Sequence, residues 1–219
     1  RPSLVPLVSE DEDCRDLQGL SLKNVTLSLV DNQTGKTLFS ELGEMLFTHY
    51  GMSGPLVLSA SSHLKTIEPG RYSIVIDLKP GLDEKQLDAR ILRDFAEFSN
   101  RDFINSLSKL LPKKMIPVIV YRCRIPAFLK VNSITKEQRH TLVSQIKRFV
   151  VPVDGFRPVE EAIITSGGVN CAEVNPRTME SKGVKGLYFA GQVLDVDGYT
   201  GGFNLQIAFC TGHAAGLFC

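Results

Sequence analysis

The residues best suited to chemistry lie near the C-terminal end, where an apolar run leads into a glycine-rich loop and then a helical pattern. The run is Gly186–Gly191, the loop ends in Gly201 and Gly202, and residues 204–216 are small or apolar at helical spacing. The first N–H groups of a helix lack partners and carry partial positive charge, and glycines let a ligand approach the backbone. This arrangement could stabilise a pyrophosphate or the edge of a reduced isoalloxazine ring. A tight crossover turn is an equally good interpretation.

His49, within the run Phe47–Gly51, is the best side-chain candidate for proton transfer, because an unperturbed imidazole titrates near neutral pH. The alternative is a structural histidine that packs a turn, since the sequence indicates no partner for it. The other three histidines have no ligand-type spacing to one another or to cysteine, so no metal site is predicted; they are His63, His140 and His213.

The composition excludes several classes of protein. The chain has 219 residues, 43% of them hydrophobic, and its net charge is +1, from 25 basic and 24 acidic residues. Because no run of Lys or Arg forms a basic block, we expect neither nucleic acid nor a membrane surface as a partner. No stretch approaches the roughly 20 apolar residues that span a bilayer. The five cysteines are odd in number and widely spaced, which indicates a reducing, cytoplasmic location.

Up to about residue 150 the pattern mixes strands with helices. Alternating apolar residues predict strands around Val25–Leu29, Lys36–Phe39 and Tyr72–Leu78, the first two joined by a turn over residues 32–35. Capping-box spacing predicts helices that begin after Asp83 and Thr135, and a further helix is expected over Phe103–Leu111. The fold class is therefore α+β, with antiparallel strands that could form a barrel-like sheet.

After residue 150 the amino-acid composition becomes rich in glycine and small side chains. The four apolar residues between Gly186 and Gly191 do not alternate with polar ones, which is typical of a strand buried on both faces in a parallel sheet. A strand, a glycine-rich loop and a helix are thus expected in this order, as in a Rossmann-like domain.

Several motifs resemble the BaiN/YhiN-like family of FAD-dependent, NAD(P)H-linked oxidoreductases. The similar segments cover nearly the whole chain, and the longest of them is the block from Gly186 to Gln206; the others are Pro2–Leu7, Gly43–Pro55, Thr165–Val169 and Asn175–Ser181. The resemblance implies a flavoprotein that takes hydride from NAD(P)H through FAD to an organic acceptor or oxygen.

The resemblance also assigns residues to the FAD. Those expected beside the ribitol and pyrophosphate are Gly191 and Gln192, with Asp195 on the cofactor side of the loop. Backbone groups at the helix start would meet the pyrimidine edge, and a neighbouring strand end would face the cofactor; these residues are Gly201, Gly202, Asn204, Leu205, Thr165, Ser166 and Gly167. The family usually has Glu where this chain has Gln192, and an amide can still accept a hydrogen bond from a ribitol hydroxyl.

The family's Gly-x-Gly-x-x-Gly fingerprint after a first strand does not occur in this sequence. We therefore expect residues 1–13 to be the exit from a missing FAD-binding half, residues 14–150 an inserted substrate module, and residues 151–219 the return to the FAD-binding domain. The expected substrate is a small molecule, and exposed sheet edges would favour a homo-oligomer. The alternative is that the chain alone is a non-catalytic substrate-binding or dimerisation module that binds no FAD.

Overall fold

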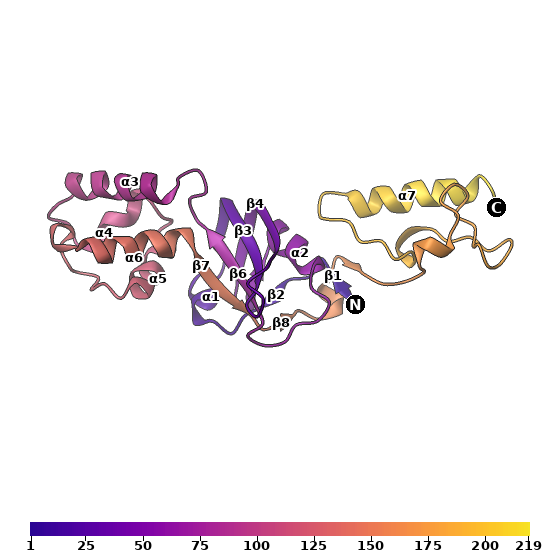
Figure 1. The fold of residues 1–219 in the computed structure, drawn as a ribbon, viewed down its shortest axis with the longest axis horizontal. Coiled ribbons are helices and arrows are strands. Elements are labelled where there is room, and N and C mark those ends of the chain that lie inside the picture. The colour runs from indigo at the N-terminus through magenta and orange to yellow at the C-terminus, as the bar shows by residue number, and fades with distance from the viewer.

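The computed structural model describes residues 1–219 as an elongated molecule of three parts: a helical part, a central sheet, and a C-terminal part (Figure 1). The strands are β1 (Pro2–Ser3), β2 (Leu7–Val8), β3 (Ser21–Asp31), β4 (Thr37–Thr48), β5 (Gly51–Ser53), β6 (Tyr72–Asp77), β7 (Phe149–Val153), β8 (Gly155–Phe156) and β9 (Ile164–Thr165). The α-helices are α1 (Glu12–Asp16), α2 (Pro55–Ser62), α3 (Glu84–Glu97), α4 (Phe103–Ser106), α5 (Met115–Cys123), α6 (Lys136–Lys147) and α7 (Phe203–Gly216).

The central sheet has seven strands in the order β7-β6-β3-β4-β5-β2-β8, and every neighbouring pair is antiparallel. In β3, Leu27 and Leu29 are fully buried while Thr26 and Ser28 are only partly covered, as the alternation predicts. The hairpin to β4 is confirmed, although β4 continues to Thr48, well beyond the expected end at Phe39. The α+β class with antiparallel strands is thus confirmed.

The two edges of this sheet are formed by one continuous stretch of chain. Residues 149–153 pair with β6, residues 155–156 pair with β2, and only Asp154 separates the two strands. The backbone N–H of Asp154 donates to the carbonyl of Val8 at 2.9 Å. The sheet therefore curls so that its ends meet at Asp154, which gives a barrel-like core without a closed barrel.

The helical module, residues 79–148, leaves the sheet after β6 and returns at β7. The predicted capping boxes are present: Asp83 accepts from the N–H of Gln86 at the start of α3, and Thr135 accepts from that of Gln138 at the start of α6. The single helix expected over Phe103–Leu111 is wrong in detail. The chain forms α4 and then a separate 3-10 turn over Leu107–Lys109, because Pro112 lies just beyond and Ser106 bonds back to the carbonyl of Phe103.

The C-terminal part contains α7 and irregular loops. The strand predicted over Gly186–Gly191 is wrong: Tyr188 makes one isolated antiparallel bridge to Glu180, and Leu187 is 40% exposed. A doubly buried strand needs a paired neighbour on each side, and no segment of residues 1–219 supplies one. The only parallel pairing here is an isolated bridge between Val169 and Leu194.

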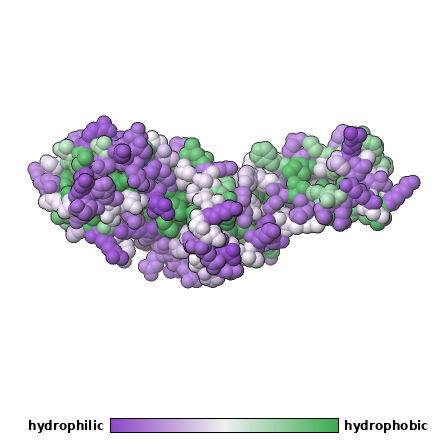
Figure 2. Space-filling model, viewed as in Figure 1, coloured by the Kyte–Doolittle hydropathy of each residue, from purple (hydrophilic) through white to green (hydrophobic).

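The surfaces of the three parts differ. Hydrophilic side chains cover much of the helical module, whereas hydrophobic side chains gather along the part that contains α7 (Figure 2). No residue of α7 is buried, and several of its apolar side chains are exposed, including Phe203, Leu205 and Phe209. None of the helices combines the length and apolar character that crossing a bilayer requires.

Candidate functional site

The C-terminal part meets the sheet through a junction formed by the loop that precedes α7. The Ser3 hydroxyl donates to Asp197 at 2.7 Å, and the Tyr199 hydroxyl lies 2.7 Å from Nε2 of His63. Phe39 packs against both rings of the second pair. A depression of about 460 Å³ opens here between the end of α2 and the loop. The start of α7 is therefore held facing the sheet.

Backbone donors at the start of α7 are free. Gly202 is the N-cap residue with φ of 91°, no side chain caps the helix, and the N–H groups of Phe203, Asn204 and Leu205 have no acceptor in the chain. These donors and the helix dipole favour an electron-rich or anionic group. At Gly202 an added Cβ would meet nothing within 4 Å, so a ligand has room to approach. The residues present thus fit the pyrimidine edge of a flavin.

The side chain of Asn204 has a role that the sequence did not indicate. Its amide accepts from the N–H of Gly198 at 2.8 Å and donates to the carbonyl of Gly198 at 2.9 Å. This pair of bonds closes the glycine-rich loop on itself and leaves the backbone N–H of Asn204 free. The signal that could have found it is an Asn at the second position of a helix that follows glycines, because Asn favours local bonds to the backbone.

The segment Thr165–Gly167, predicted to face the cofactor, contacts Asp195 through Gly167. Gly167 donates its N–H to Oδ1 of Asp195 at 3.0 Å. Thr165 is exposed at the end of β9, and Ser166 is buried. The next residue, Gly168, has φ of 145°, and a Cβ there would lie 2.4 Å from the carbonyl oxygen of Val193. Only glycine allows these two segments to approach so closely.

Gly191 and Gln192 form a 3-10 turn, Gly191–Val193, that packs on α7. Gly191 donates its N–H to the Thr211 hydroxyl at 3.0 Å, and that hydroxyl donates to the carbonyl of Ile207 at 2.7 Å. The side chain of Gln192 is exposed and has no hydrogen-bond partner in the chain. Gly191 thus lies against α7, whereas the segment Thr165–Gly167 contacts β1 and Asp195.

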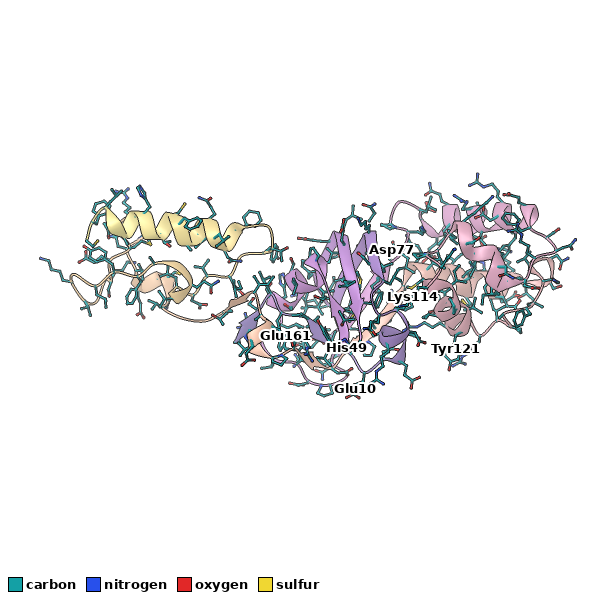
Figure 3. All side chains as sticks on the ribbon, turned by 180° about the vertical axis from the view of Figure 1, so that it is seen from behind. Glu10, His49, Asp77, Lys114, Tyr121 and Glu161 are labelled. Atoms are coloured by element: carbon teal, nitrogen blue, oxygen red, sulfur yellow. The ribbon has the colours of Figure 1, made fainter.

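His49 lies apart from α7, at one end of the central sheet and near Glu161 (Figure 3). It is exposed, and its ring packs edge-on against Tyr50, with centroids 4.9 Å apart. The guanidinium of Arg157 lies over Tyr50 and donates to Glu161 at 3.0 Å. The pKa of Glu161 is lowered, first by this hydrogen bond and further by the charges of Arg157 and His49.

These features define the class of protein. A curled antiparallel sheet carries an inserted helical module and is joined to a C-terminal segment in which the start of a helix can accept an anion. The family model described as HI0933-like protein barrel and H2TH domain matches residues 1–164, and the chain belongs to this family.

Three characterised relatives match along nearly the whole chain. Ribosomal RNA dihydrouridine synthase of Escherichia coli (strain K12) is 32% identical over 98% of this chain, and that of Haemophilus influenzae is 33% identical over 99%. The 3-dehydro-bile acid delta(4,6)-reductase of Clostridium scindens is 29% identical over 98%. These matches cover 50%, 51% and 52% of the relatives, so the chain spans about half the length of the curated relatives it matches. The chain is thus related to oxidoreductases.

The expectation that nucleic acid is excluded as a partner is wrong, because two of the relatives are named for action on ribosomal RNA. The physical reason lies in how the charge is distributed. The helical module contains fifteen Lys and Arg against seven Asp and Glu, a net charge of +8, whereas the rest of the chain contains ten against seventeen, a net charge of −7. The overall charge of +1 averages over two parts of opposite sign, and such asymmetry is itself typical of nucleic-acid binding.

Proposed function

We propose that this chain is part of an FAD-dependent oxidoreductase that takes its electrons from NAD(P)H and reduces a carbon–carbon double bond of a base in RNA. The names of the relatives carry the reaction type, since a dihydrouridine synthase and a delta(4,6)-reductase both describe the addition of hydrogen to a double bond. RNA is the favoured substrate because two relatives carry that name and because the helical module is positively charged. Five free cysteines are consistent with a cytoplasmic enzyme.

Within such an enzyme, residues 14–150 would bind the substrate, and residues 1–13 and 151–219 would belong to the FAD-binding part. The pairing of β1 with β9 supports grouping the first residues with the C-terminal part, because it joins Pro2 to Thr165 and Ser3 to Ile164, whereas β2 and β8 pair within the central sheet. The bond between Ser3 and Asp197 joins the same two segments again.

The observation that carries the proposal is the uncapped start of α7. Bound FAD would supply hydride transfer. The chain's own contribution is electrostatic: the free N–H groups of Asn204 and Leu205 would stabilise negative charge on the flavin edge, and Gly201 and Gly202 would keep the approach open. Gly191, Gln192, Asp195 and the Thr165–Gly167 segment would hold the remainder of the cofactor.

A second candidate for the chain on its own is a substrate-binding module without cofactor. The observation in its favour is that α7 has no buried residue, so its part of the flavin site is covered on one side only.

Absorbance in the flavin band, recorded after incubation with FAD and desalting, separates these candidates. Retained flavin that is lost in Gly202→Ala would support the proposal, because an alanine at φ of 91° is strained and would fill the approach. Gly183→Ala is the matched control, since Gly183 lies in the same part without a positive φ. If the protein extended to the length of its relatives retains no flavin, the proposed function is wrong.

A further inference from the structure

The excess charge of the helical module is free to act on a partner. Six of its cations form ion pairs, among them Arg139 with Asp88 and Lys147 with Asp77. Nine form none: Lys79, Lys85, Arg93, Arg101, Lys113, Lys114, Arg124, Lys136 and Arg148. Of the seven acidic residues, four are already used in pairs within the module, which leaves a surface with unbalanced positive charge.

Part of this charge lies on one face of α5. Lys114, Pro117, Tyr121 and Arg124 follow one another at intervals of three or four residues, which places them along one side of a helix. All four are exposed, whereas Ile116, Ile119 and Cys123 on the other side are buried in the core. We name this set, with the adjoining Lys113, the α5 face.

The α5 face combines cations with exposed aromatic area. Tyr121 is 81% exposed and Phe128, a few residues after α5, is 77% exposed, more than any other large hydrophobic side chain of the chain. Little of the surface of these two rings is buried by the fold, so the rings are available to stack on a ligand. Phe128 is held near the base of α4, because the neighbouring Ala127 accepts from the N–H of Ile104 at 3.0 Å.

A depression of about 400 Å³ adjoins the α5 face between α4 and α5, and Lys113 and Pro117 form one side of it. The other side presents Asn105 and Ser108, whose polar groups are exposed and can donate or accept hydrogen bonds. On the flank of α5 toward α1, Lys114, Pro117 and Tyr121 line a second depression together with Glu12, Asp13 and Asp16. Those carboxylates would repel phosphate, so they limit the α5 face on that flank.

We propose that the α5 face binds a single-stranded segment of RNA, an inference that rests on the proposed function for its choice of RNA. Lys113 and Arg124 contact phosphates, and Tyr121 stacks on a base. Asn105 and Ser108 meet base edges in the depression between α4 and α5. Unstacked bases suit this surface, because the reduction of a base requires access to atoms that a duplex covers.

The test is the binding of a fluorescein-labelled single-stranded RNA to the chain, followed by anisotropy over a range of salt concentrations. The double variant Lys113→Gln/Arg124→Gln should bind roughly tenfold more weakly, and the slope of log Kd against log salt should fall by about 1.4, which corresponds to two phosphates of a single strand. The control Lys36→Gln/Lys65→Gln removes the same charge from exposed, unpaired positions outside the helical module and should leave both quantities nearly unchanged.

Variants of Tyr121 test the proposed stacking contact separately. Tyr121→Ala should weaken binding about fivefold or more, and Tyr121→Phe should retain the affinity, because stacking needs the ring and not the hydroxyl. Neutralising the flank toward α1 with Glu12→Gln/Asp16→Asn should leave binding intact or strengthen it. Thermal unfolding of each variant separates a lost contact from a lost fold.

The inference would be overturned by equal weakening in the α5-face pair and the control pair, or by a folded chain that binds no RNA above background. Full affinity in Tyr121→Ala would also do so. Flavin retention, measured on the same samples, keeps the two proposals distinct. A chain that holds flavin but no RNA refutes only the α5 face, and a chain that binds RNA through that face but whose full-length form holds no flavin refutes only the proposed function.

Discussion

His63 and Tyr199 stand 136 residues apart in the sequence, yet Nε2 of the first and the hydroxyl of the second are 2.7 Å apart. This bond joins the end of α2 to the loop before α7 and so ties the C-terminal part to the sheet.

Replacing Tyr199 with Phe removes this bond and keeps the packing of the ring against Phe39. An exposed hydrogen bond contributes about 1 kcal/mol, so the C-terminal part should detach about five times as often. Hydrogen exchange of residues 195–202 measures this opening. Tyr188→Phe is the matched control, because the Tyr188 hydroxyl bonds to the carbonyl of Phe218 within the same part. Equal exchange rates in both variants would contradict a docking role.

Gly51 is the glycine whose replacement should damage the sheet most. Its φ is 142°, and a Cβ would lie 2.3 Å from the carbonyl oxygen of Leu7, on the strand that pairs with β5. Gly51→Ala should therefore lower the free energy of unfolding by more than about 2 kcal/mol in urea denaturation. Gly81→Ala, at an open position without a positive φ, should change it little. Similar midpoints for the two variants would refute the role of this close approach.

Asp31, at the end of β3, should make stability depend on pH. Its burial acts to raise the pKa, but hydrogen bonds from Thr34 and Gln33 and the charge of Arg71 outweigh it, so the pKa is lowered. A lowered folded-state pKa contributes stability above the unfolded pKa, and this stability is lost as pH falls through the folded pKa.

Asp31→Asn should therefore destabilise the protein at neutral pH, and the difference from wild type should shrink below about pH 4. Urea unfolding at several pH values provides the measurement. The control is Glu41→Gln, since Glu41 is exposed and forms no ion pair. If the difference in stability between Asp31→Asn and wild type stayed the same in acid, the charge of Asp31 would not be its cause.

The five cysteines should separate into two groups by reactivity. Burial raises the pKa of Cys14 and of Cys123 to about 12, so neither has appreciable thiolate at neutral pH. Cys171, Cys210 and Cys219 are exposed. A chromogenic disulfide reagent should label those three quickly and reach the other two only after unfolding. Rapid labelling of Cys14 in the folded protein would mean that α1 opens far more readily than its packing indicates.

Local signals in the sequence predicted what depends on neighbours along the chain. Asp83 and Thr135 predict the starts of α3 and α6, because a capping box involves residues only three positions apart. The alternation of apolar residues predicts β3, because one face of that strand is buried. The sequence does not predict α5, because Pro117 is typical of a position where a helix ends. The first turn of a helix tolerates proline, however, and Pro117 lies in the first turn of α5.

Features that depend on distant partners could not be read from the sequence. The run Gly186–Gly191 has the composition of a buried strand but finds no neighbours within these residues. The contact of His63 with Tyr199, and the gathering of free cations on α5, both require the folded chain. Glycine spacing did indicate the region around α7, because close backbone approach and positive φ leave glycine as the residue that fits.

The helical module begins and ends at adjacent strands. Ile76 of β6 pairs with Phe149 of β7, and Leu78 donates its N–H to the carbonyl of Ile146 at 2.9 Å. Residues 79–148 therefore connect two neighbouring antiparallel strands, as the loop of a hairpin does. Such an insertion can change in length, charge or shape over evolution while the strands keep their register. Under the proposed function, a change in this one segment would alter RNA binding and leave the strand pairing of β6 with β7 intact.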